Sequence, residues 1–228
     1  MNDTLTFNLI QNAIDSLERS VDLLAWREEP NEAKRMKQAI LSVAHGIELL
    51  LKERLRQVHP SLVWENVDKY PSLSARTVTV DTALVRLTNI GGLQFAEEDV
   101  KLIRELRDKR NAIEHFAWSI STQDANAVVG SALGFAVFFS KSHLGYDFLG
   151  HYTKDDDTFH QLLSSSAEFR RAYERHRDYN AWQINQTKCR VCNALAVNPK
   201  SGVCTLCGHI HQLSEYSSPG GFDDDIPF

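Results

Sequence analysis

Apolar residues recur with helical spacing through most of the first 180 residues. Between Leu5 and Trp26 they fall at positions 9, 10, 13, 14, 17, 21 and 24, one face of a helix with 3.6 residues per turn. A second stripe follows Pro30, which suits a first helical turn, and ends at Val58 before another proline. The pattern predicts two long amphipathic helices.

The pattern continues with one short and three long helical segments. We expect a small helix after Asp81, whose side chain could cap it, and a break at Gly91-Gly92. The long segments cover residues 95–116, 124–141 and 158–182. Gly130 and Gly134 in the second of these would permit close helix packing. The sequence therefore predicts a mainly α fold, a bundle of about five helices.

The helical pattern stops near residue 185, where cysteine, glycine and proline replace it. We therefore expect a helical domain over residues 1–184, a small cysteine-containing β domain over 185–215 and a disordered acidic tail over 216–228.

The net charge of −5 argues against a general nucleic-acid coat protein but allows an RNA-cutting enzyme with local basic residues. Two basic clusters exist, Arg104, Arg107, Lys109 and Arg110, and then Arg170, Arg171, Arg175 and Arg177. We interpret the second as a solvated helix face. No signal-peptide pattern opens the chain, and the most apolar window, 125–139, is too short for a bilayer. We expect a cytoplasmic protein without membrane contact.

All four cysteines lie within 19 residues as two Cys-x2-Cys pairs: Cys189, Cys192, Cys204 and Cys207. Two such pairs can fill a tetrahedral site, so we expect a structural Zn²⁺ in a zinc ribbon. Asn193 and Gly208 follow the pairs and tolerate the positive φ that such turns need. His209 and His211 are left out, because four cysteines suffice. The ribbon could bind nucleic acid, bind protein or only stabilise the module.

Arg110, Asn111 and His115 lie at the end of the segment 95–116. A permanently charged guanidinium and a titratable imidazole are the minimum equipment for cutting a phosphodiester without a metal. Asn111 and His115 share a helix face, which Arg107 extends, and Arg110 lies about 100° around the helix from Asn111. The alternative is a polar patch at a helix end.

The stretch Ala44-His-Gly-Ile-Glu-Leu-Leu-Leu-Lys52 together with Arg110-Asn-Ala-Ile-Glu-His115 resembles the HEPN superfamily, over roughly residues 5–150. The hallmark of that family is an arginine, often followed by a polar residue, and a histidine after four to six further residues; here four separate Arg110 from His115. The resemblance implies a metal-independent ribonuclease in which the 2′-hydroxyl of RNA attacks the adjacent phosphate. His115 would be the acid/base, Arg110 would stabilise the phosphorane and Asn111 would orient the phosphate or the histidine. It also implies a homodimer whose two motifs share one cleft.

Glu48 is a candidate partner that would position Arg110, and a pair with Lys52 on its own helix is an equal alternative. Glu114 could pair with Arg110 or remain a solvated charge. Some HEPN toxins have a tyrosine, modified by a partner nucleotidyltransferase, two residues after the histidine; this chain has Ala117.

The leading expectation is an endoribonuclease, a toxin or phage-defence effector with an RNA substrate and an antitoxin or defence-system partner. One alternative is a non-catalytic adaptor whose bundle and ribbon bind a partner protein or nucleic acid. A transcription regulator that uses the ribbon on DNA is weaker, since the net charge is negative and no recognition helix stands out.

Overall fold

The fold is mainly helical, as the sequence predicts, with a very small sheet near the C-terminus. The computed structural model describes residues 6–26, 31–148, 157–176, 187–204 and 206–212. The chain divides into two compact units, residues 1–177 and 178–228. The predicted boundary at 185 and the predicted tail over 216–228 lie outside the described residues.

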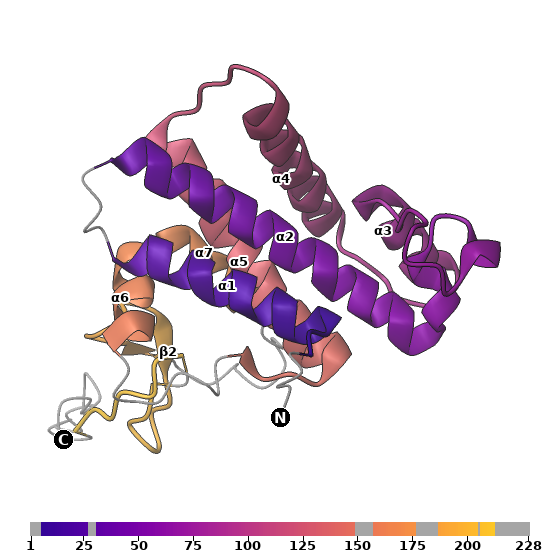
Figure 1. The fold of residues 1–228 in the computed structure, drawn as a ribbon. Coiled ribbons are helices and arrows are strands. Elements are labelled where there is room, and N and C mark those ends of the chain that lie inside the picture. The colour runs from indigo at the N-terminus through magenta and orange to yellow at the C-terminus, as the bar shows by residue number, and fades with distance from the viewer. Residues whose placement is uncertain (1–5, 27–30, 149–156, 177–186, 205, 213–228) are drawn as a thin grey trace, which may run out of the picture. The chain divides into compact units, whose positions relative to one another are not determined.

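Seven α-helices make up the first unit within its described residues (Figure 1). They are α1 (Leu9–Ala25), α2 (Glu32–Val58), α3 (Val80–Asn89), α4 (Glu97–His115), α5 (Thr122–Leu144), α6 (Asp157–Ser165) and α7 (Ala167–His176). Two short 3₁₀ helices, Pro60–Val63 and Val67–Lys69, lie in the connection between α2 and α3. The second unit contains β1 (Thr187–Lys188) paired antiparallel with β2 (Leu195–Val197).

Side-chain caps fix where the long helices begin. Asn8 accepts a hydrogen bond from the Gln11 backbone N–H at 2.9 Å and so opens α1. Ser121 accepts from the Asp124 backbone N–H in the same way, so α5 begins at Thr122, two residues before the predicted start at 124. The cap of α3 is Thr79, so the prediction that Asp81 caps this helix is wrong.

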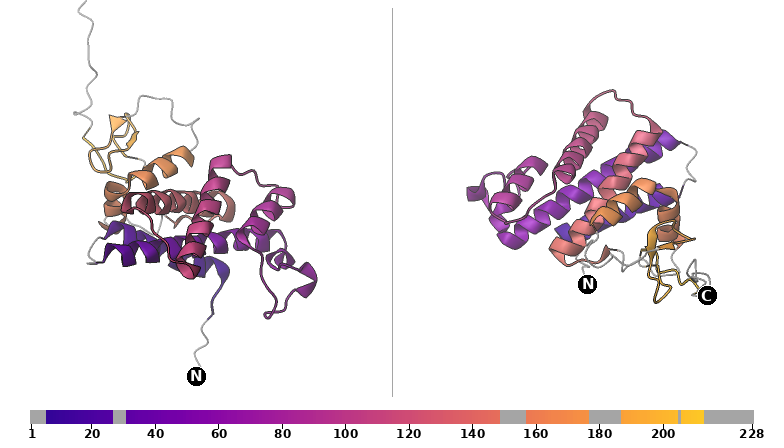
Figure 2. Two further views of the ribbon diagram at one scale, coloured as in Figure 1. Left: turned by 90° about the horizontal axis from the view of Figure 1, so that it is seen from above. Right: turned by 180° about the vertical axis from the view of Figure 1, so that it is seen from behind.

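α5 forms the centre of the helical unit because its apolar residues surround the helix instead of forming one stripe. Helices α1, α2 and α7 pack around it (Figures 1 and 2). α5 is long and apolar enough to cross a membrane, but 61% of its most apolar window is buried in this unit, as in the core helix of a soluble protein.

Two glycines allow α7 to approach α5 closely. A Cβ atom at Gly130 would lie 2.6 Å from the Ser166 Oγ, and one at Gly134 would lie 2.6 Å from the Ala172 Cβ. Both separations are too short for real contacts, so any side chain here would force the helices apart. The packing role predicted for these glycines is confirmed.

The predicted helix over residues 158–182 is wrong, because two helices, α6 and α7, occupy the described part of this segment. The break falls at Ser166, a buried residue whose Oγ accepts a hydrogen bond from the Phe169 backbone N–H at 3.2 Å. The serine thus caps α7 with its side chain, and a serine in this role competes with helix continuation. Residues 177–182 lie outside the described part.

α4 packs against α2, α3 and α5, and its buried residues lie between its start and its middle. Its fully buried residues are Asp99, Ile103 and Leu106, and Asp99 forms an ion pair with Arg175 of α7 at 2.6 Å. The second half of α4, including the predicted site, is therefore at least partly open to solvent.

Candidate functional site

α4 ends where the predicted motif ends. His115 is its last residue, and Phe116 then adopts extended φ and ψ while its backbone N–H bonds to the Ala112 carbonyl oxygen at 3.0 Å. Three acidic residues in the first turn stabilise the opposite end of the helix. The predicted helix over 95–116 is confirmed.

Arg110 continues the stripe of Ile103 and Leu106 toward the bundle, and its side chain is 41% exposed. Its Nε lies 2.9 Å from the Glu114 Oε2, and its Nη1 donates to the Asn111 Oδ1 at 3.3 Å. An i,i+4 pair of this exposure is worth only about 0.3–0.5 kcal/mol. A phosphate, which can accept two charge-assisted hydrogen bonds from arginine, can therefore displace Glu114.

His115 is exposed, and its ring nitrogens have no hydrogen-bond partner within the described ranges. Five positions along a helix correspond to about 140° of rotation, so Arg110 and His115 project in different directions. No hydrogen bond or ion pair joins these two side chains where the structure describes them. The motif brings Arg110 to Asn111 directly and leaves the imidazole open to a ligand.

Glu48 pairs with Lys52 on its own helix, Nζ to Oε1 at 2.6 Å, and Lys52 also donates to the Thr77 Oγ1 at 2.9 Å. This is the alternative that the sequence left open. No contact between Glu48 and Arg110 accompanies it in the described residues.

The other basic residues of the first cluster are also paired. Asp81 of α3 binds both Arg104 and Arg107, and Glu105 binds Lys109 at 2.9 Å. The Asp81 pairs join positions more than twenty residues apart, so sequence spacing gave no indication of them.

Two exposed aromatic side chains directly after His115 did not enter the predicted site. Phe116 is 74% exposed and its ring centroid lies 6.4 Å from that of His115. Trp118 is 37% exposed, with the Lys109 Nζ 5.9 Å from its ring centroid. The sequence could have indicated these two aromatic residues, because they follow a candidate catalytic histidine closely.

The four cysteines of the second unit are buried, and their sulfur atoms lie within 4.8 Å of one another. The Sγ atoms of Cys189 and Cys207 are 3.6 Å apart, and those of Cys192 and Cys204 are 3.7 Å apart. A tetrahedron with Zn–S bonds of about 2.3 Å has sulfurs about 3.8 Å apart. The cluster can hold a metal ion and is compatible with zinc.

Both cysteine pairs sit on turns with the same hydrogen bonds. The N–H groups of Cys189 and Cys204 bond to the carbonyls five residues ahead, at 2.8 and 2.7 Å. The residue after each pair, Asn193 or Gly208, returns a bond to the first cysteine and has φ of 58° or 75°. The positive φ predicted at these two positions is confirmed.

The thiols also share protons. A hydrogen bond from the Cys192 thiol lowers the pKa of Cys204 to about 2, and the same interaction raises the pKa of Cys192. One buried thiolate thus opposes ionisation of its neighbours. A divalent cation at the centre would remove this opposition by compensating the buried negative charge.

His211 was not predicted to take part in the metal site, yet it is buried and its Nε2 lies 3.3 Å from the Cys189 Sγ. An imidazole N–H in this position donates to a ligand sulfur and orients it. His209 is exposed, although its ring centroid is only 4.6 Å from that of His211.

Comparisons with protein-family models, curated proteins and solved structures find no match to this chain. A functional assignment therefore depends on the residues and the geometry described above.

His211→Ala should weaken metal retention about ten-fold. Loss of a group that hydrogen-bonds to a metal ligand typically costs about 10- to 100-fold in metal affinity. Competition with a chromogenic chelator, followed by metal analysis per chain, measures the effect. His209→Ala is the matched control and should match the wild type. Equal metal retention in both variants would show that His211 does not support the cluster.

Proposed function

We propose that this protein is a metal-independent endoribonuclease of the HEPN type. The observation that carries the proposal is that Arg110, Asn111 and an exposed His115 lie within the last six residues of α4 in a helical bundle, with Arg110 joined to Asn111. The resemblance of this motif and of the α2 stretch around Glu48 to that family supports the same assignment.

In the proposed reaction, His115 takes the proton of the RNA 2′-hydroxyl as the 2′-oxygen attacks the neighbouring phosphorus. The bond from phosphorus to the 5′-oxygen breaks, and the leaving oxygen receives a proton. The products are a 2′,3′-cyclic phosphate and a 5′-hydroxyl. Arg110 stabilises the charge on the phosphorane oxygens, with Asn111 holding the phosphate or the imidazole in place.

Substrate binding replaces the partner of Arg110. The guanidinium leaves the Glu114 carboxylate, 2.9 Å away, and binds the scissile phosphate. Because the displaced ion pair is partly exposed and weak, this exchange costs little.

A homodimer would complete the site. Proton removal and proton donation need two groups, and each chain offers one histidine in this motif. A two-fold axis near the end of α4 would supply a second His115 and a second Arg110 to one cleft.

The second unit would bind one structural Zn²⁺ through Cys189, Cys192, Cys204 and Cys207, with a closed four-thiolate shell and no catalytic role. It would serve as an adaptor for the substrate or a partner. In this proposal the protein is a cytoplasmic toxin or phage-defence effector, restrained by an antitoxin or defence-system partner protein.

The proposed chemistry predicts RNA cleavage in EDTA that depends on the motif. His115→Ala should lower the cleavage rate by about 10²- to 10⁴-fold, the usual contribution of a general acid/base. Arg110→Ala should lower it by about 10²- to 10³-fold, as for loss of one transition-state donor. Single-turnover cleavage of labelled RNA, with end-group analysis and retained zinc measured in the same sample, tests both.

Arg171→Ala is the control, because Arg171 is a well-exposed arginine on α7, outside the motif. It should cleave at the wild-type rate. Undiminished cleavage by the two motif variants would refute the proposed mechanism.

Glu114→Gln should raise kcat/KM about two-fold, because it removes the carboxylate that competes with the phosphate for Arg110. Glu105→Gln removes the same charge from the same helix but frees Lys109 instead, so it controls for a general change of charge. Steady-state cleavage at low salt measures both. An identical gain in the two variants would mean that Glu114 has no specific effect on Arg110.

A non-catalytic adaptor is the second candidate function. The specific observation in its favour is that all four basic residues of the first cluster are already in ion pairs: Arg104, Arg107, Lys109 and Arg110. Such a surface is less able to hold RNA than an unpaired one. Wild-type protein that leaves RNA intact in the cleavage assay would favour this reading.

If the protein is an adaptor, its sequence suggests residues 222–228, Phe-Asp-Asp-Asp-Ile-Pro-Phe, as the segment that binds a partner. These residues lie outside the described part of the chain. Three carboxylates beside an apolar Ile-Pro-Phe suit an apolar pocket with a basic rim on a partner. A synthetic peptide of residues 219–228 should then displace a co-purifying partner, whereas one with Ile226 and Phe228 replaced by alanine should not. Displacement by both peptides, or by neither, would argue against this segment as the contact.

A further inference from the structure

A hollow of about 560 Å³ lies between the start of α2, the end of α4 and the start of α5. Its apolar lining comes from these elements and the loop after α4: Met36, Ile40, Ile113, Phe116, Trp118 and Ile120. Glu32, Lys37, Ser119 and Thr122 add polar atoms to it, with one charge of each sign. The volume is in the range of small-ligand sites, and most such sites join an apolar lining to a few polar groups.

The aromatic residues of this hollow lie beside the proposed catalytic group. Phe116 lines the hollow and follows His115 directly, with the two ring centroids 6.4 Å apart. Phe116 is 74% exposed, so a ligand can reach its ring.

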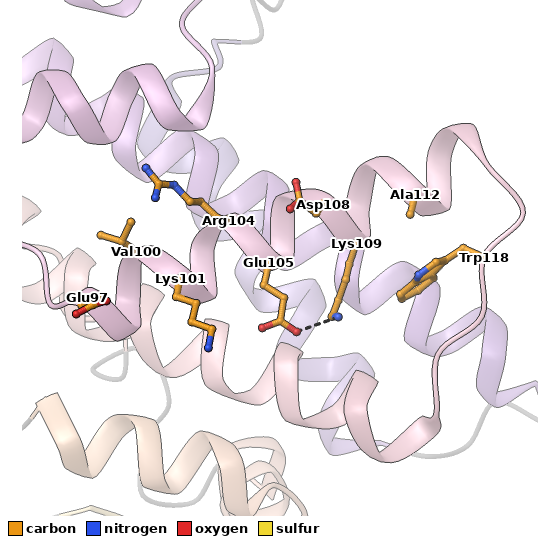
Figure 3. A pocket seen from close by; sticks show the side chains of 9 residues that line it. All are labelled: Glu97, Val100, Lys101, Arg104, Glu105, Asp108, Lys109, Ala112 and Trp118. Carbon is orange, nitrogen blue, oxygen red and sulfur yellow. Dashed lines mark ion pairs between the residues drawn. The ribbon is translucent and has the colours of Figure 1, made fainter.

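Trp118 connects this hollow to a second one, of about 740 Å³, along the outer face of α4 (Figure 3). Three cations, Lys101, Arg104 and Lys109, line the second hollow together with three carboxylates, Glu97, Glu105 and Asp108. Lys109 is paired with Glu105, and Arg104 is paired with Asp81. The Lys109 Nζ lies 5.9 Å from the Trp118 ring centroid. A flat aromatic surface flanked by cations can hold a base and its neighbouring phosphate together.

We propose that Phe116 and Trp118 form a nucleobase-binding site that takes an unpaired base next to the scissile phosphate. This inference rests on the proposed ribonuclease function and identifies the part of the RNA that the site recognises. A base stacked on Phe116 leaves the adjoining ribose and phosphate beside His115. Because a paired base is stacked within its duplex, the site selects single-stranded RNA.

A helix or strand of a partner protein is a poorer occupant. A volume of about 560 Å³ suits one compact group such as a nucleobase, whereas a helix or strand needs an extended groove. The continuity of the hollow with His115, through Phe116, favours an RNA strand whose scissile phosphate lies at the imidazole.

The test uses a fluorescein-labelled single-stranded 2′-O-methyl RNA, which binds without being cut because it has no free 2′-hydroxyl. Full-length protein should bind this probe at least ten-fold more tightly than the same probe in a duplex. Phe116→Leu and Trp118→Leu should each weaken single-strand binding about ten-fold, the usual effect of losing one stacked base. Phe116→Tyr keeps the aromatic ring and should bind the single strand as the wild type does.

Phe7→Leu is the matched control, because Phe7 is 69% exposed and lies before α1. It should bind as the wild type does. Unchanged single-strand binding by both site variants would overturn the inference, and so would an equal loss for single strand and duplex. The variants could instead sediment as monomers and lose affinity for every probe to the same extent. That outcome would assign the two aromatics to a protein interface.

The outcomes also separate this inference from the nuclease proposal. Stacking-dependent binding without any RNA cleavage would retain the base site and refute the nuclease. Cleavage that depends on His115 but is indifferent to Phe116 and Trp118 would retain the nuclease and refute the base site.

Discussion

The need to bury α5 on all sides is the constraint on which the helical unit depends. A helix without a polar face has to be covered all round, and α1, α2 and α7 supply most of that cover. Gly130 and Gly134 let α7 come close enough to complete it. α4 buries Ile103 and Leu106, and no residue after Leu106 in this helix is fully buried. Its second half is free to carry polar groups.

The chemistry proposed for the end of α4 depends on how firmly its charges are held. Arg110 has a carboxylate partner four residues away, and the pair is too exposed to be strong. Arg104 and Arg107 are held by Asp81 on another helix, which links α4 to α3. The arginine of the motif therefore has a local partner that a phosphate can replace, whereas its neighbours serve the fold.

The second unit is built on a different principle. Its sheet is too small to enclose an apolar core, so a metal ion bound by the four buried sulfurs would supply the stabilisation that a larger domain obtains from packing. The two turns that hold the cysteines have the same hydrogen bonds, and this repeated geometry brings the sulfurs to near-tetrahedral separations. His211 then acts on the cluster from outside, through the Cys189 sulfur.

The sequence by itself determined the positions of most helices, the four cysteines that can share one site and the backbone form of Asn193 and Gly208, because these follow from spacing and steric rules within one turn or one helix. Only the tertiary structure decided the break at Ser166, the pairing of Asp81 with two arginines and the contact of His211 with Cys189. It also decided that Glu48 binds Lys52 while Arg110 binds Glu114. Each charged group had several partners within reach along the chain, and the packing of the helices selects among them.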